Sequence, residues 1–264
     1  MKTVAIIQAR LGSTRLPGKI FADIAGAPML AHVVRRVRNA QRVDLVVVAT
    51  TVSPDDDEVE AFCRANAILV TRGSVNDVLS RYHDAATSLG ADVVVRVTAD
   101  CPFIDPSVVD DVVREFLKRG QDYVSNVNPP TYPDGLDTEV FTAAALALAA
   151  KRAALPSERE HVTPFIRNHP ELFRLANVSL DDDLSAMRWT VDEPADLAFV
   201  RAVASRMGSM DFGFRELAAM IRSDDTLEES NRGIERNAGY AKSLREDAAP
   251  ASSRETMRDD AQIE

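Results

Sequence analysis

A basic, glycine-containing stretch near the start of the chain has the residue types that bind a polyphosphate. It covers residues 8–19 and reads QARLGSTRLPGK. Its candidate ligand-binding residues are three cations, two glycines and two hydroxyl residues: Arg10, Arg15, Lys19, Gly12, Gly18, Ser13 and Thr14. Glycines let backbone N–H groups approach a ligand, arginine offers a planar fork to phosphate oxygens, and lysine offers a point charge.

The spacing in this stretch excludes two common nucleotide motifs. Five residues separate Gly12 from Gly18 and Ile20 follows Lys19, so the Walker pattern G-x4-G-K-[ST] is not met, and G-x-G-x-x-G does not occur. A polar surface loop with a basic rim is the alternative interpretation. The stretch follows the apolar run Thr3–Ile7, and loops at the carboxyl ends of parallel strands are where α/β sheets bind ligands.

An aspartate follows the most strand-like run of the chain. That run is Asp92–Thr98, and Asp100 comes directly after it, before Cys101 and Pro102. We expect Asp100 to face the same crevice as the basic loop, where a metal chelated by a triphosphate would lie. An aspartate before a turn proline is also ordinary turn chemistry, which is the alternative.

Two further segments are rich in ionisable side chains. Residues 128–139 hold three prolines, which predict a rigid loop, and carry Asp134, Asp137 and Glu139. Their alternative interpretation is a turn at Asp134 followed by an exposed strand. Residues 156–164 begin a helix, and capping explains only one acid of this dense run.

The basic stretch resembles, residue for residue, the signature A-R-x-x-S-x-R-L-P-x-K of sugar-activating cytidylyltransferases. These include the synthetases of CMP-linked Kdo and sialic acids, and the closest resemblance is to the spore-coat-polysaccharide type. The likeness covers roughly residues 3–205. It includes the segments Y-P-D-G-x-D-x-E, E-R-E-H-V-T-P and D-x-P-x-D-L.

The resemblance implies transfer of the cytidylyl group from CTP to an acidic sugar, with Mg²⁺ held by Asp100 and Asp192. An N-terminal helix cap is the alternative for Asp192. Catalysis would rest on Lys19, Arg10 and Asp100, and Arg72 would help hold the nucleotide. The implied acceptor-binding residues are Tyr132, Asp134, Asp137, Glu139, Arg159 and His161. Arg159 is the expected receiver of the acceptor's carboxylate, and a homodimer is implied because the segment with Arg159 often reaches the neighbouring subunit.

Apolar runs alternate with amphipathic stretches along the chain, which predicts right-handed βαβ crossovers. We expect an α/β fold, a three-layer Rossmann-like nucleotidyltransferase with a mostly parallel mixed sheet. Phe173–Val178 and Met187–Val191 are expected to form an antiparallel pair. The predicted domain covers residues 1–222, and residues 223–264 form a polar acidic tail, partly ordered and disordered after about Asp247.

Composition excludes several classes of protein. The formal net charge of −10 argues against a nucleic-acid binder, and no apolar run reaches the roughly 18 residues of a membrane span. Cys63 and Cys101 lack disulfide or metal spacing, and no signal-peptide pattern precedes the first strand, so a reducing cytoplasm is expected. Open alternatives for function are transfer of another nucleotide or to a phosphorylated alcohol, glycosyl transfer, and CTP binding without turnover.

Overall fold

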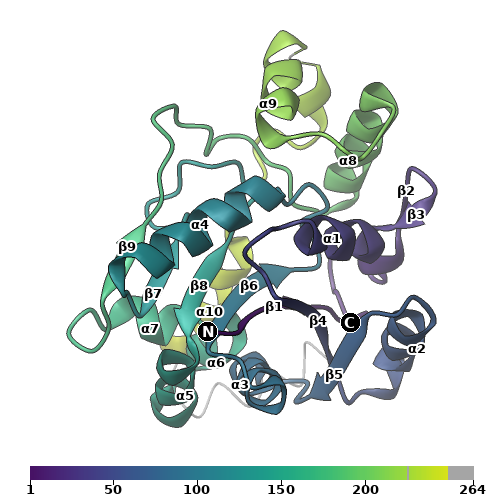
Figure 1. Ribbon diagram of the computed structural model, residues 1–264. Coiled ribbons are helices and arrows are strands. Elements are labelled where there is room, and N and C mark those ends of the chain that lie inside the picture. Colours follow the sequence, from purple (N-terminus) through teal and green to yellow (C-terminus); the bar gives the residue numbers. More distant parts are fainter. Residues whose placement is uncertain (225, 249–264) are drawn as a thin grey trace.

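A seven-stranded mixed sheet forms the centre of the protein (Figure 1). This computed structural model describes residues 1–224 and 226–248. In spatial order the strands are β5 (Leu69–Gly73), β4 (Leu45–Thr51), β1 (Thr3–Gln8), β6 (Val93–Thr98), β8 (Glu139–Thr142), β7 (Tyr123–Ser125) and β9 (Leu175–Asn177). Neighbouring strands are parallel except around β8, which is antiparallel to both β6 and β7.

Helices cover both faces of this sheet. They are α1 (Met29–Arg38), α2 (Asp57–Ala65), α3 (Val78–Leu89), α4 (Pro106–Arg119), α5 (Ala143–Arg152), α6 (Pro156–His161), α7 (Pro164–Asn168), α8 (Pro194–Met207), α9 (Phe214–Ser223) and α10 (Ala238–Ala248). Short 3₁₀ turns occur at Lys19–Phe21, Pro54–Asp56 and Leu227–Ser230, and β2 (Asp23–Ile24) pairs with β3 (Ala27–Pro28). Side chains of α1, α2, α4, α8 and α9 pack on one face, and those of α3, α5 and α7 pack on the other.

Burial on both faces explains the continuous apolar runs of the parallel strands. In β1, Ala5 and Ile7 pack toward α1, while Val4 and Ile6 pack toward α3, and all four side chains are fully buried. The expected three-layer α/β architecture is confirmed.

The chain reverses its direction across the sheet between β1 and β6. From β1 it proceeds through β4 to β5 on one side, and it then crosses back to place β6 on the other side of β1. The carboxyl ends of β1 and β6 therefore lie next to each other at a topological switch point, where ligands bind in open α/β sheets.

The expected antiparallel pair near residue 180 is wrong. β9 instead pairs in parallel with β7, and residues 187–191 contribute only an isolated parallel bridge between Arg188 and Asp134. The amide of Trp189 donates to the carbonyl of Asp134 at 2.6 Å, and that of Asp134 donates to the carbonyl of Met187 at 2.9 Å. This segment therefore pairs with the proline-rich loop.

The segment after α9 is more ordered than its polar composition indicates, at least as far as Ala248. Helix α10 packs against α6, where Ser243 hydrogen-bonds to His161 at 3.0 Å and Asp247 accepts from the amide of Ser157 at 3.1 Å. These contacts are polar, so hydrophobic periodicity does not reveal them. The disorder expected after about Asp247 falls almost entirely on residues 249–264, which lie outside the described residues.

Two smaller expectations concern the cysteines and the membrane. Cys63 and Cys101 are both free and buried. Within residues 1–224 and 226–248, no helix combines the length and the apolar composition that a bilayer span requires.

Candidate active site

Backbone contacts shape the basic loop that follows β1. The amide of Leu11 donates to Asp56 Oδ1 at 2.8 Å, and the carbonyl of Leu11 accepts from the amide of Gly18 at 3.2 Å. Gly18 has φ +69°, a left-handed conformation that glycine adopts without steric cost. A Cβ at Gly12 would meet no described atom within 4 Å, so this part of the loop lies open, and Arg10 is exposed beside it.

Lys19 joins the two aspartates that the sequence places at strand ends. Its Nζ lies 2.9 Å from Asp100 Oδ2 and 2.9 Å from Asp192 Oδ1, and it donates to the carbonyl of Val191 at 2.8 Å. The Lys19 side chain is only 11% exposed. Residues that are distant in sequence thus meet at the switch point between β1 and β6.

The charges of this cluster stabilise one another. Burial alone would lower the pKa of Lys19, but Asp100 and Asp192 outweigh burial and raise it. For Asp100, burial alone would raise the pKa, but Lys19 and the hydroxyl of Thr98 bring it down to about 2. Asp100 is therefore a carboxylate and Lys19 an ammonium across the neutral pH range.

The pair of carboxylates suits a hard divalent cation. Asp100 and Asp192 each place an oxygen on the same ammonium, so both face one point that a positive charge already occupies. Carboxylate oxygens are ligands that Mg²⁺ accepts, with phosphate and water completing its octahedral shell. Among the described residues no group of three or more His, Cys, Asp or Glu side chains could hold a metal by itself.

Arg15 approaches the cluster from the basic loop. Its Nη2 lies 2.8 Å from Asp192 Oδ1 and its Nη1 lies 3.5 Å from Glu193. Glu193, and not Asp192, is the N-cap of α8, where Asp196 accepts from the amide of Glu193 at 2.9 Å. Asp192 is therefore free of the capping role that its sequence position allowed.

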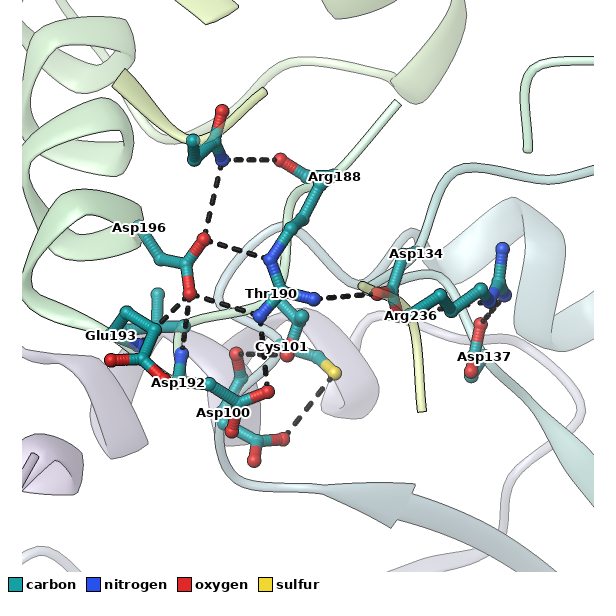
Figure 2. A network of polar contacts seen from close by, with 12 residues as sticks. Asp100, Cys101, Asp134, Asp137, Arg188, Thr190, Asp192, Glu193, Asp196 and Arg236 are labelled. Atoms are coloured by element: carbon teal, nitrogen blue, oxygen red, sulfur yellow. Dashed lines mark hydrogen bonds and ion pairs between the residues drawn. The ribbon is translucent and has the colours of Figure 1, made fainter. Parts of the chain in front are cut away.

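A buried arginine connects this cluster to the proline-rich loop (Figure 2). Arg188 is 6% exposed, and its guanidinium contacts Asp134 at 3.0 Å, Asp192 at 3.1 Å and Asp196 at 2.9 Å. These four residues form a polar network that links the Lys19 cluster to the segment after Pro133.

Replacing Arg188 with alanine should destabilise the protein by about 3–5 kcal/mol, because Asp196 is fully buried and would lose its guanidinium partner. Urea unfolding measures this change. Arg206→Ala is the matched control, since Arg206 is 57% exposed in its pair with Asp224 and should cost less than about 1 kcal/mol. Similar losses in the two variants would contradict a buried role for Arg188.

The proline-rich loop contributes two carboxylates near this network. Asp134 Oδ2 pairs with Arg188, and Asp137 Oδ1 lies 2.6 Å from Arg236 Nη2 (Figure 2). Gly135 between them has φ +109°, and a Cβ there would lie 2.7 Å from the amide nitrogen of Thr190, so only glycine fits. The Asp137 side chain is 29% exposed, which leaves it accessible to a ligand.

Tyr132 and Glu139 point into the protein. Tyr132 is 3% exposed, with its ring 5.8 Å from that of Phe214. Glu139 is 4% exposed and pairs with Arg96, and it also accepts hydrogen bonds from Tyr123 at 2.6 Å and Thr163 at 2.7 Å. Their sequence interpretation as acceptor-binding residues gains no support from these positions.

Three other residues expected in the site have their polar partners elsewhere. Arg72 binds the carbonyls of Thr51 and Ser53 and pairs with Asp57 and Glu60, which ties β5 to α2. The guanidinium of Arg159 contacts the carbonyl of Ala153 and Asp77, and His161 contacts Ser243. Among residues 1–224 and 226–248, no direct hydrogen bond or ion pair joins these three side chains to the network around Lys19.

Sequence reasoning missed Arg188 and Arg236. Arg188 lies within an expected strand, and Arg236 lies in the polar tail, where it also donates to the carbonyl of Tyr132 at 3.1 Å. No spacing signal marks either residue. Asp196 could have been found, because it is the second aspartate of the segment D-E-P-A-D-L.

Asp137 predicts a pH effect. Burial, with Asp134 and Glu139 adding and Arg236 opposing, raises the pKa of Asp137 to about 7. Between pH 4 and 7 the folded state therefore holds a proton on Asp137 that the unfolded state has lost. Because the folded state binds more protons, the free energy of unfolding falls as the pH rises from 4 toward 7. From pH 5 to 8, the unfolding free energy of wild type should fall relative to that of Asp137→Asn in urea titrations. Asp182→Asn, at an exposed carboxylate, is the control and should stay parallel to wild type.

Comparison with known proteins adds to this geometry. A family model described as cytidylyltransferase matches residues 4–253. The spore coat polysaccharide biosynthesis protein SpsF of Bacillus subtilis is 34% identical over 233 residues, covering 85% of this chain and 96% of the relative. A 3-deoxy-manno-octulosonate cytidylyltransferase of Anaeromyxobacter sp. is 34% identical over 192 residues, covering 69% of this chain and 76% of the relative.

A solved structure gives the same result. The structure of a cytidylyltransferase from Leptospira borgpetersenii superposes with a TM-score of 0.84 at 34% identity. The match covers 89% of this chain and all of that one.

Proposed function

Because the chain belongs to the cytidylyltransferase family, we propose that it transfers the cytidylyl group of CTP to a hydroxyl of an acidic sugar and releases pyrophosphate. The observation that carries this proposal is the position of Lys19, the last residue of the basic loop, between Asp100 and Asp192 at the switch point. Such a cluster is suited to a triphosphate with its metal.

The basic loop holds the triphosphate in this proposal. The groups that contact phosphate oxygens are the guanidinium groups of Arg10 and Arg15, the ammonium of Lys19, and the Gly12 and Ser13 amides. Asp100 and Asp192 would hold Mg²⁺, which would supply positive charge that neutralises phosphate charge. Arg188 fixes the orientation of the Asp192 carboxylate, because it donates to Asp192 Oδ2 while Lys19 donates to Asp192 Oδ1.

The reaction needs little covalent help from the protein. The acceptor oxygen bonds to the α-phosphorus as the bond from that phosphorus to the bridging oxygen of the pyrophosphate breaks, and the proton of the acceptor hydroxyl is released to water. Catalysis then comes from alignment of the two oxygens and from stabilisation of charge on the phosphates. Lys19 and Arg15 supply positive charge at the place where that charge develops.

An acidic sugar is the acceptor that the relatives favour. One relative's name refers to 3-deoxy-manno-octulosonate and another's to a spore coat polysaccharide. Ulosonic or nonulosonic acids combine a carboxylate with several hydroxyls. Asp137 can accept from such hydroxyls, and Arg236 is the guanidinium beside it. Arg236 therefore joins Arg159 as a proposed receiver of the acceptor's carboxylate.

A matrix of nucleotides and acceptors tests the proposal. Pyrophosphate release is measured with CTP, UTP, ATP and GTP, each with 3-deoxy-manno-octulosonate, a nonulosonic acid, or an alditol phosphate. Release only with CTP and a sugar acid is expected, and it should stop when magnesium is chelated. Higher rates with alditol phosphates would replace the sugar-acid assignment with transfer to a phosphorylated alcohol.

Two wider assignments accompany this function. The free, buried Cys63 and Cys101 fit a cytoplasmic enzyme, where thiols stay reduced. A homodimer is part of the proposal, and light scattering of the purified chain tests it, with a monomer as the contrary result.

A further inference from the structure

The last stretch of the chain that the structure describes, residues 232–248, lies across the proline-rich loop, and we call it the C-terminal strap. Near its start, the guanidinium of Arg236 contacts Asp137 Oδ1 at 2.6 Å (Figure 2) and donates to the carbonyl of Tyr132 at 3.1 Å. Asp137 is the carboxylate assigned above to the hydroxyls of the acceptor. The strap therefore holds an oxygen that the acceptor needs.

The strap also lies against residues 156–164, whose dense run of ionisable side chains capping does not explain. In α10, the Ser243 hydroxyl lies 3.0 Å from His161 Nε2 and donates to Glu160 Oε2 at 2.8 Å. The centre of the Tyr240 ring lies 5.1 Å from that of the His161 ring. One segment thus engages polar groups of both stretches in which the sequence places acceptor-binding residues.

Polar contacts, and hardly any apolar packing, attach the strap to the protein. Within residues 232–248, Ser243 is the only buried residue, and none of the side chains belongs to either hydrophobic core. Helix α4 shows the contrast, because four of its valines are fully buried. Elements with few buried apolar contacts open locally at a lower free energy than that of global unfolding. We therefore expect the strap to open while the rest of the protein stays folded.

Opening should begin after Asn231 and unwind α10. Asn231, directly before the strap, is buried and donates to the carbonyl of Arg188 at 2.9 Å, so it stays with the core. Helix α10 has 11 residues, and isolated helices shorter than about 12–15 residues are marginal in water. Once Ser243 leaves α6, the helix should therefore unwind, and Arg236 is then no longer held against Asp137.

We propose that the C-terminal strap is an autoinhibitory element, in which α10 keeps Arg236 on Asp137 and release of α10 frees both groups for the acceptor. The inference rests on the function proposed above, since it concerns the acceptor side of the same site. With α10 released, Arg236 can turn to the carboxylate of the sugar acid, and Asp137 can accept from its hydroxyls. The apparent affinity for the acceptor then equals the intrinsic affinity multiplied by the fraction of molecules with α10 released.

The KM for the acceptor in two variants of α10 tests this inference. The acceptor is 3-deoxy-manno-octulosonate or a nonulosonic acid, whichever releases more pyrophosphate with CTP. Ser243→Ala loses two hydrogen bonds to α6, so α10 should be released about five- to thirtyfold more often, and the KM for the acceptor should fall by up to that factor. Gly239→Ala acts in the opposite direction. A Cβ at Gly239 would meet no described atom within 4 Å, so alanine should stabilise the helix and raise this KM about two- to fivefold.

The KM for CTP should change in neither variant, because CTP binds at the basic loop and not at Asp137. Ser223→Ala is the matched control. Ser223 is an exposed serine of α9 whose hydroxyl donates to a carbonyl of its own helix, and its replacement should leave both KM values as in wild type. A higher KM for the acceptor in Ser243→Ala would make α10 a support of the acceptor site, and it would overturn the inference.

Hydrogen exchange followed by mass spectrometry gives a readout that does not depend on turnover. The amides of α10 should exchange through an opening that is less sensitive to urea than the opening of α4. Ser243→Ala should raise the exchange rate of α10, and Gly239→Ala should lower it. Because binding is reciprocal, the acceptor should speed the exchange of α10, where a ligand that simply packed against the strap would slow it.

The exchange results also separate this inference from the proposed function. Exchange of α10 with the urea dependence of α4 would show that the strap opens only by global unfolding, and it would overturn the inference while the proposed function stands. Slower exchange of α10 in the presence of the acceptor would do the same. An enzyme that turns over no acceptor overturns the proposed function, whereas the exchange of α10 still decides whether the strap opens separately.

Discussion

Asp100→Asn is expected to lower kcat at least a hundredfold while the protein stays folded. The pKa of Asp100 is held near 2, so the substitution removes a full negative charge at neutral pH without changing the size of the side chain. The charge supports both Lys19 and, in the proposed function, Mg²⁺. At about 1.4 kcal/mol for each tenfold change, a hundredfold loss needs less than 3 kcal/mol of transition-state stabilisation. Pyrophosphate release with CTP and a sugar acid measures it.

Glu193→Gln is the matched control for this variant. Glu193 follows Asp192 directly and contacts Arg15 at 3.5 Å, but it lies outside the pair that faces Lys19. It should keep kcat within a few-fold of wild type. A near-normal kcat in Asp100→Asn, with chelation of magnesium harmless to wild type, would remove Asp100 from the proposed metal site.

Lys19→Met is expected both to inactivate the enzyme and to make its stability depend on magnesium. The Lys19 side chain is 11% exposed and lies between two carboxylates, so its removal leaves Asp100 and Asp192 facing each other. Breaking a buried pair by removing one partner costs about 3–5 kcal/mol, and Arg15, 2.8 Å from Asp192, should reduce the loss to the lower part of that range. Urea unfolding with and without magnesium measures it. Added magnesium should stabilise the variant more than wild type, where the ammonium already occupies the shared position.

Lys242→Met controls for the loss of a lysine as such. Lys242 is 67% exposed on α10, and its replacement should change neither turnover nor the response to magnesium. Equal stabilisation of wild type and Lys19→Met by magnesium would show that the ion does not bind between Asp100 and Asp192. Normal turnover in Lys19→Met would remove Lys19 from the catalytic residues.

The parts of the fold that sequence predicts are those with strong local signals. β1 and β6 are apolar runs buried on both faces, and each ends in a polar residue at the same edge of the sheet. Because parallel strands align their carboxyl ends, the meeting of Lys19 with Asp100 could be expected from the sequence pattern. The expectation that Asp192 joins Asp100 depended on the family resemblance, because a helix cap explained the position of Asp192 in the sequence equally well.

The contacts that sequence did not predict are long-range and polar. Arg236 reaches Asp137 across about a hundred residues, and neither residue has a periodic pattern that marks the pairing. Arg159 was expected to bind the carboxylate of the acceptor, and its guanidinium donates to the carbonyl of Ala153 and to the carboxylate of Asp77. The type of a charged residue indicates which groups it can bind. Which of these groups it contacts depends on how the other helices and strands pack around it.

The attachment of the segment after α9 limits how the protein can be shortened. Asn231 is buried, and its amide group donates to the carbonyl of Arg188 at 2.9 Å, while Arg236 supplies the counter-charge of Asp137. A chain cut after Ser223, close to the domain end that composition predicts, would lose both contacts and expose one side of the carboxylate–arginine network. Truncated versions for crystallisation or fusion should therefore retain the chain through Ala248 and carry any added partner at the amino end, where Met1 is exposed.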